Sequence, residues 1–312
     1  MPAGSVQFHQ HLGGRFAPTP PPGPNEIAPG VVAPKNEAEY IDLMVEELKM
    51  ARVEGLVCLA DPGSYRDAHT IENLKQISLR SNVHVVLGGG YGQDLAMASR
   101  YPEAVKKMSE DQLAEELIRD TPTQRWGAYG EISTSQPTRP EDKKVLRAIG
   151  KAALKTRLPI FTHTPHAGCS DCAIDQLDAF ESVGVDPHRI CIGHLSTIKP
   201  DAEPLGQTAK LLGKRGAWLG FDTVGHVMTQ SMIPEQHKVK YFLALLEMGF
   251  EDQLLLASDS TPVPLLKANW GDGYGALLKQ FVPKLSYAGV SDRVLHKILV
   301  DNPRRFLAFV PA

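Results

Sequence analysis

Two short stretches decide the fold: LPIFTH at residues 158–163 and RICIGH at residues 189–194. Each is an almost unbroken apolar run that ends in a histidine. Continuous apolar runs are typical of strands buried on both faces, as in a parallel sheet that helices cover. The two histidines, His163 and His194, stand 194 − 163 = 31 positions apart, which is about one strand–helix unit. The spacing therefore predicts consecutive parallel β/α units.

The same pattern of apolar run and amphipathic stretch repeats along the whole chain. The predicted strands are Ser5–His11, Gly55–Asp61, His84–Gly88, Gly127–Ile132, Leu158–His163, Arg189–His194, Ala217–Asp222 and Gln253–Asp259. Amphipathic helices are expected at Ala38–Arg52, Glu141–Thr156 and Gln236–Met248. Eight such units predict an α/β fold, a (β/α)8 TIM barrel that forms a single domain over residues 1–312. An open doubly wound sheet is the alternative, but no glycine-rich dinucleotide fingerprint follows the first strand.

Composition excludes several classes of partner. The chain has 312 residues and a formal net charge of −3, so bulk charge does not attract it to nucleic acid or to an anionic membrane. No apolar run approaches the roughly 18 residues that cross a bilayer, and the start shows no signal-peptide pattern. We therefore expect a cytoplasmic protein with reduced thiols. The CxxC pair Cys169 and Cys172 is interpreted as chance spacing near a helix start rather than as a zinc or redox motif.

Acidic and imidazole side chains stand at the ends of the predicted strands. They are His9, His11, Glu131, His163, His194 and Asp259. Each one alone has a structural interpretation, as a hydrogen-bonding histidine or a helix-capping carboxylate. Together they converge on the carboxyl end of the barrel, where barrel enzymes build their sites. Such a cluster is costly to bury unless cations offset the charge, so the joint pattern favours a metal site.

The donor set indicates which metals fit. Imidazoles with carboxylates suit zinc, cobalt, manganese or iron better than calcium or magnesium. Six donors are too many for one tetrahedral zinc, so they divide into two sites that share a carboxylate. We expect two divalent transition-metal ions per chain, with zinc as the first choice. A pair of such ions can hold a hydroxide and stabilise the charge of a displacement, which predicts a hydrolase.

Two loops are expected over this face of the barrel. The proline-dense segment 15–35 follows the first strand, and Ser260–Tyr274 follows the last. Proline-rich sequence cannot form a helix interior, and loops at the carboxyl ends of strands carry function in barrels. Both loops are candidate walls of a substrate pocket.

The chain resembles a known family. Segments FHQHL, GEISTS, FTHT, IGHLS, LGFDTVG, LLLASDS and NPRRF resemble the phosphotriesterase-like branch of the amidohydrolase superfamily, in the family's order. The form they resemble most is the phosphotriesterase homology proteins, in which a glutamate bridges the metals. The resemblance implies that His9, His11 and Asp259 hold the more buried metal. It also implies that His163 and His194 hold the more exposed one and that Glu131 bridges them. Asp259 would then accept the proton of the attacking hydroxide.

The resemblance also implies residues near the substrate. Tyr91 matches a family position beside the substrate, and Lys267 is the remaining cation in a loop where relatives carry basic residues. The seventh strand ends in Asp222-Thr223, where several lactonase relatives have Asp-Arg. Fewer cations at the mouth weaken the case for a strongly anionic substrate.

Three functions remain open from the sequence. The first is a hydrolase of small esters, most of all a lactonase or carboxylesterase with phosphotriesterase side activity. The second is an amide hydrolase acting on an N-acyl amine or amino acid, which needs a proton donor for the poorer leaving group. The third, of another class, is a non-catalytic metal-containing barrel that binds a ligand. Each takes a small molecule, and the resemblance is compatible with a homodimer.

Overall fold

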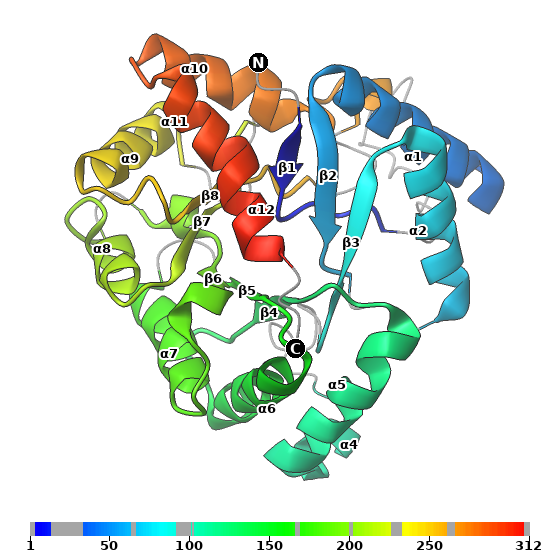
Figure 1. Ribbon diagram of the computed structural model, residues 1–312, viewed down its shortest axis with the longest axis vertical. Coiled ribbons are helices and arrows are strands. Elements are labelled where there is room, and N and C mark those ends of the chain that lie inside the picture. Colours follow the sequence, from blue (N-terminus) through cyan, green and yellow to red (C-terminus); the bar gives the residue numbers. More distant parts are fainter. Residues whose placement is uncertain are drawn as a thin grey trace, which may run out of the picture.

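Eight parallel strands, surrounded by helices, form the centre of this computed structural model (Figure 1). The structure describes residues 4–13, 34–63, 67–91, 101, 103–165, 169–199, 202–225, 233–260 and 266–308. The strands are β1 (Ser5–Gln7), β2 (Leu56–Asp61), β3 (His84–Gly89), β4 (Ala128–Ser133), β5 (Ile160–His163), β6 (Ile190–Ile192), β7 (Trp218–Phe221) and β8 (Leu254–Leu256). Each pairs in parallel with the next in the chain, which confirms the predicted barrel.

The helices follow the strands in turn. They are α1 (Glu37–Val53), α2 (Ala68–Ser81), α4 (Glu103–Lys107), α5 (Glu110–Gln124), α6 (Pro140–Thr156), α7 (Ser170–Glu181), α8 (Gln207–Lys214), α9 (Glu235–Glu247), α10 (Val282–Tyr287), α11 (Asp292–His296) and α12 (Asn302–Leu307). The helices predicted at 38–52, 141–156 and 236–248 correspond to α1, α6 and α9 within one residue at each end. The amphipathic pattern is the reason for this agreement, because each helix buries one stripe against the strands.

The first strand is shorter than predicted. Its ladder stops at Gln7, four residues before the predicted end at His11. Beyond Gln7 the backbone bonds to the ends of other strands instead: Gln10 N donates to Ala60 O at 2.9 Å and His11 N donates to Ser260 O at 3.1 Å. The segment that carries His9 and His11 is therefore held beyond the end of the β1 ladder and is not part of the sheet.

The same contacts close the barrel. Among the described residues, the paired strands run from β1 to β8 without a β8–β1 ladder. Ser260 N, beyond β8, donates to the side-chain oxygen Oε1 of Gln10 at 2.8 Å, and His11 N returns a bond to Ser260 O. These two bonds join the carboxyl ends of the first and last strands.

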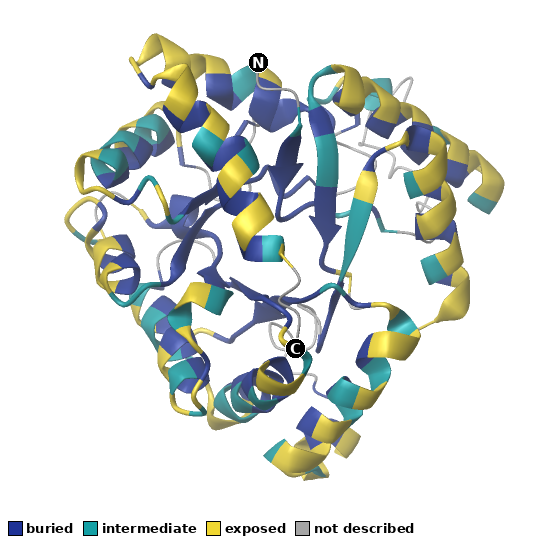
Figure 2. Cartoon of the chain, viewed as in Figure 1, coloured by how far each residue is buried: buried dark blue, intermediate teal, exposed yellow. Residues whose placement is uncertain are grey.

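The interior of the barrel is aromatic toward its amino end. Phe8 and Phe161 meet edge to face, and Phe306 of α12 packs against Phe8 and Trp218. Helix α12 crosses in front of the strands in Figure 1 and covers this end. Figure 2 shows most of the strands buried, except the start of β3, and the helices exposed on their outer faces. The carboxyl ends are thus the end available for a site.

No helix in the described part of the chain is both long and apolar enough to cross a bilayer.

Candidate metal centre

The six strand-end residues that the sequence singled out meet at the carboxyl ends of the strands. His163 is the last residue of β5 and Glu131 lies within β4, whereas the other four follow their strands by a few residues. All are buried except His11, whose side chain is 21 % exposed. Residues from five different strands therefore converge on one point, as the barrel geometry requires.

One group of donor atoms forms around the two histidines that follow β1. The Nε2 atoms of His9 and His11 lie 3.3 Å apart. Asp259 Oδ1 lies 3.4 Å from His9 Nε2 and 3.1 Å from His11 Nε2. Three donor atoms thus face a common point. Asp259 reaches it from a backbone with φ of 48°, a left-handed conformation that is rare for a residue with a side chain.

A second group forms around β5 and β6. His194 Nε2 lies 2.8 Å from His163 Nδ1 and 2.9 Å from Glu131 Oε1, and His163 Nδ1 also contacts Glu131 Oε1. The other oxygen of Glu131, Oε2, lies 3.4 Å from His9 Nε2 and 3.7 Å from His11 Nε2. Glu131 therefore presents one oxygen to each group.

Asp222 is a residue of this site that the sequence did not identify as functional. Its Oδ2 accepts from His9 Nδ1 at 3.0 Å, and its Oδ1 accepts from His194 Nδ1 at 3.0 Å and from His194 N at 2.8 Å. The signal was present, since Asp222 directly follows the apolar run of β7. The sequence comparison presents Asp222 only as a difference from the Asp-Arg of lactonase relatives.

Asp222 fixes the protonation pattern of both rings. Burial alone would raise the pKa of Asp222, but His194 and His9 outweigh it and hold the pKa well below its usual range. An ionised carboxylate only accepts, so Nδ1 of each ring carries the hydrogen. In the neutral ring, Nε2 then bears a lone pair that points into the cluster. Carboxylate partners of this kind orient metal-binding histidines.

The electrostatics of the cluster favour positive charge. Burial lowers the pKa of His9, but Glu131 and Asp259 outweigh it and raise the pKa well above its usual value. For His194, Asp222 and Glu131 overcome burial and raise the pKa to about 10. Burial prevails only at His163, whose pKa is lowered. The carboxylates thus stabilise a cation at the point where the histidine lone pairs converge.

The donor set fits divalent metal ions. Three groups of His, Asp and Glu side chains form here, and within each group the possible ligand atoms lie within 4.8 Å of one another. Two of the three groups share Glu131. With Nδ1 of His9 and His194 bound to Asp222, a metal ion would replace the Nε2 protons that the raised pKa values favour on these rings. Glu131 Oε2 is buried and has no hydrogen-bond partner among the described residues. Metal ions satisfy these atoms without protonating the rings.

The two predicted substrate residues, Tyr91 and Lys267, bond to carboxylates that are not among the six residues of the cluster. The hydroxyl of Tyr91 donates to Glu116 Oε1 of α5 at 3.1 Å. The ammonium of Lys267 pairs with Glu54, the residue that follows α1. The next residue, Gly55, accepts a hydrogen bond through its carbonyl oxygen from the N–H of Ser5, the first residue of β1. Lys267 therefore lies toward the amino ends of the strands. Most of the predicted loops, residues 14–33 and 261–265, fall outside the described residues.

The expectation of reduced thiols is wrong for one pair of cysteines. Cys169 and Cys172 form a disulfide, and Cys58 and Cys191 are free. The first turn of α7 brings the Cα atoms of the pair to 5.1 Å, within the range that a disulfide spans. In this form the two sulfur atoms are not available as zinc ligands.

A parallel barrel with a histidine–carboxylate cluster at the carboxyl ends of its strands is typical of the metal-binding class of (β/α)8 proteins. The model of the phosphotriesterase family matches residues 29–307, and the chain belongs to this family. The likeness expected from the sequence segments is thereby confirmed.

Relatives of known name match most of the chain. The N-acetyltaurine hydrolase of Salmo salar is 27% identical over 98% of this chain and 94% of its own length. The N-acetyltaurine hydrolase of Tetraodon nigroviridis is 29% identical over 79% of this chain and 71% of its own length. The enzyme of that name from Homo sapiens is 26% identical over 85% of this chain and 76% of its own length.

Two solved structures share the fold. A resiniferatoxin-binding protein from Rhodobacter sphaeroides has a TM-score of 0.79 at 27% identity, covering 97% of this chain and 90% of its own. A phosphotriesterase homology protein from Escherichia coli, complexed with phosphate in its active site, has a TM-score of 0.77 at 24% identity, covering 99% and 100%. The second likeness concerns the fold alone.

Proposed function

We propose that this chain is a metal-dependent amide hydrolase that cleaves a small N-acylated amine or amino acid, with N-acetyltaurine as the first compound to test. The observation that carries the proposal is the cluster of His, Glu and Asp donors around one point at the barrel mouth. The names of the relatives support an amide as the bond, rather than the lactone or ester that the sequence favoured.

The cluster provides places for two divalent cations. His9, His11 and Asp259 would hold one, His163 and His194 would hold the other, and Glu131 would contact both. Bound there, the ions would polarise the carbonyl of the substrate and lower the pKa of a water to near neutrality. Zinc is our first choice, with cobalt, manganese and iron as alternatives.

Asp259 is the residue placed to move the proton. Its side chain is 6% exposed, and its Oδ1 lies 3.1 Å from Nε2 of His11, the partly exposed member of the cluster. Burial would raise the pKa of Asp259, but His9 and His11 outweigh it and keep the carboxylate ionised. It can therefore accept a proton from the attacking water and deliver it to the leaving amine. Amines leave poorly unless they are protonated, so this second transfer matters more for amides than for esters.

The experiment is a comparison of matched substrates. Protein loaded with zinc, cobalt or manganese is given N-acetyltaurine, N-acetyl amino acids, the corresponding esters and simple lactones. We expect kcat/KM to be highest for an N-acetyl compound, and Asp259→Asn to abolish it while Asp301→Asn, an exposed change, does not. Lactone or ester turnover far above every amide would contradict the proposal, as would an Asp259→Asn variant of full activity.

A further inference from the structure

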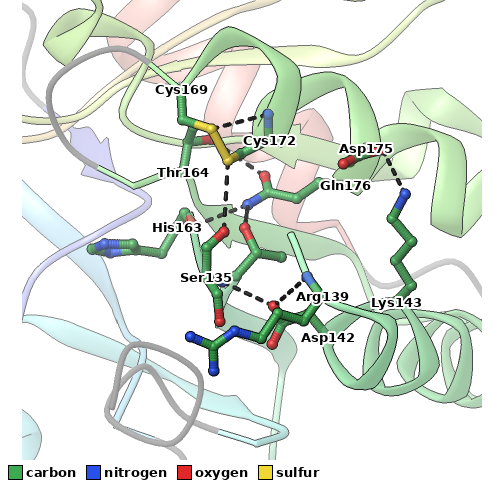
Figure 3. The surroundings of a disulfide bond; sticks show 11 residues. Ser135, Arg139, Asp142, Lys143, His163, Thr164, Cys169, Cys172, Asp175 and Gln176 are labelled. Carbon is green, nitrogen blue, oxygen red and sulfur yellow. Dashed lines mark hydrogen bonds and ion pairs between the residues drawn. A yellow bond between two sulfur atoms is a disulfide. The ribbon is translucent and has the colours of Figure 1, made fainter. Parts of the chain in front are cut away.

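The disulfide lies beside the candidate metal centre. Cys169 is the N-cap of α7 and Cys172 lies in its first turn, so the bond spans the start of that helix. Cys172 Sγ lies 3.6 Å from Ser135 O, so the turn packs against the loop after β4 (Figure 3). As a thiol, Cys172 could donate to this carbonyl oxygen, whereas the disulfide sulfur has no hydrogen to give.

One turn beyond Cys172, Gln176 connects the same helix to the backbone of a candidate ligand. Its Nε2 donates to His163 O at 2.9 Å and to Thr134 Oγ1 at 3.0 Å. Its Oε1 accepts from Thr162 Oγ1 at 2.7 Å and from Thr164 Oγ1 at 3.2 Å. In Figure 3 Gln176 extends from α7 between the disulfide and His163. The first turns of α7 thus hold the end of β5.

The position of Cys169 favours thiol chemistry. Its Sγ accepts the hydrogen of Cys172 N at 3.3 Å, a bond that would be stronger to a thiolate. Helix N-termini stabilise thiolates, and CxxC pairs at such positions exchange with external thiols. Cys169 is 8% exposed whereas Cys172 is 1% exposed, so an external thiol reaches Cys169 first.

We propose that Cys169 and Cys172 form a reversible thiol–disulfide site that takes electrons from a dithiol reductant and adjusts the end of β5 at His163. A thiolate of the reductant attacks Cys169 Sγ, the Cys169–Cys172 bond breaks, and Cys172 leaves with the electron pair and takes up a proton. The second thiol of the reductant then attacks the mixed disulfide and releases Cys169 as a thiol. The protein gains two electrons and two protons, and the reductant becomes a disulfide.

Reduction changes what keeps the first turn of α7 wound. The disulfide joins the N-cap to that turn, and the Gln176 bonds to the end of β5 start one turn further along the same helix. Without the disulfide, the hydrogen bonds of the helix alone keep the turn wound. The reduced form is expected to have a kcat/KM about threefold to tenfold lower, the size of effect that a coupled network carries.

The first test traps the thiols of the native protein. The protein is equilibrated in buffers of reduced and oxidised dithiothreitol, alkylated with a maleimide and analysed by peptide mass. We expect the Cys169–Cys172 peptide to gain two labels together in reducing buffer, with circular dichroism unchanged, and to lose both in oxidising buffer. Labelling only after denaturation would overturn the proposal, as would full labelling in oxidising buffer. Peptides with Cys58 and Cys191 serve as internal controls.

The second test measures turnover. Cys169→Ser/Cys172→Ser should match the reduced wild type and ignore dithiothreitol, whereas Cys58→Ser should respond as the wild type does. A fully reduced wild type with unchanged kcat/KM would overturn the coupling to β5. Only this arm rests on the proposed amide hydrolysis. If no substrate is turned over in either form, the proposed function fails while the trapping result still decides the redox site, including where the double variant does not fold.

Discussion

Asp222 joins His9 to His194: one carboxylate oxygen accepts from His9 Nδ1 and the other from His194 Nδ1, each at 3.0 Å. The two histidines lie in separate groups of the cluster, so one buried side chain sets the orientation of both. Their Nε2 atoms point to Glu131 as a result. The geometry of the candidate metal centre therefore depends on a residue that need not touch a metal.

Asp222→Asn should weaken metal binding. The asparagine can still accept from one histidine, but its amide group would face the other ring as a donor. That ring must then carry its hydrogen on Nε2, which removes a lone pair from the cluster. We expect metal retention against a chelator to fall by about 10-fold to 100-fold. Asp186→Asn, an exposed change, is the matched control, and equal metal content in the two variants would contradict this role.

Gly193→Ala should disturb the same carboxylate. A Cβ at Gly193 would lie 2.1 Å from Thr162 O and 2.9 Å from Asp222 Oδ2. Backbone cannot yield as a flexible side chain does, so we expect a loss of about 1–3 kcal/mol in unfolding free energy. Metal retention should fall as well. Gly184→Ala meets no atom within 4 Å and controls for the added methyl group, although its positive φ carries some strain. A Gly193→Ala variant as stable as the wild type would show that this packing is mistaken.

Gln176→Met should destabilise the end of β5. The substitution keeps the volume but leaves His163 O and three threonine hydroxyls without their buried partner. An unsatisfied buried group costs about 1–3 kcal/mol, so the midpoint of urea unfolding should fall clearly. The exposed Gln236→Met of α9 should change little. Identical midpoints for the two variants would rule out the role given to Gln176.

Lys238 makes stability depend on pH in the alkaline range. Burial lowers its pKa from 10.5 to about 8, while its ammonium donates to Thr223 O. Below pH 8 both the folded and unfolded chains hold the proton, and folding bears the full cost of burying the charge. Between pH 8 and 10.5 only the unfolded chain holds it, so stability rises with pH.

Lys238→Met should remove this rise. The wild type should gain at most about 3 kcal/mol relative to the variant between pH 7 and pH 10.5, since each unit of pKa shift is worth about 1.4 kcal/mol. Urea unfolding of both proteins across this pH range measures the difference in their unfolding free energies. Other titrating groups contribute equally to the two proteins and cancel in this difference. Parallel stability curves would contradict the lowered pKa.

The barrel was predictable because its signals are local. Continuous apolar runs such as 158–163 mark buried parallel strands, and the amphipathic stretch at 141–156 marks its helix. The strand ends were predicted too long at β1 and β8, because residues there leave the ladder to bond with each other across the closure of the barrel. Sequence periodicity does not record that contact.

The site was predictable where chemistry and strand position coincide. His163 and His194 end apolar runs, and a barrel brings such ends together whatever lies between them. The surroundings of Lys267 depend on a contact between distant segments. Lys267 resembles a loop cation, but Glu54, 213 positions earlier, holds it at the other end of the barrel. The Cys169–Cys172 bond depends on the first turn of α7, which the spacing alone does not fix.

The most direct test is the metal content of the purified chain. Protein from metal-supplemented medium should contain about two equivalents of transition metal per chain, as expected for a paired metal centre, and His163→Ala should lose about one. Anomalous diffraction should place both ions between Glu131 and the four histidines. A chain without bound metal after such growth, or a His163→Ala variant with the wild-type content, would contradict the account.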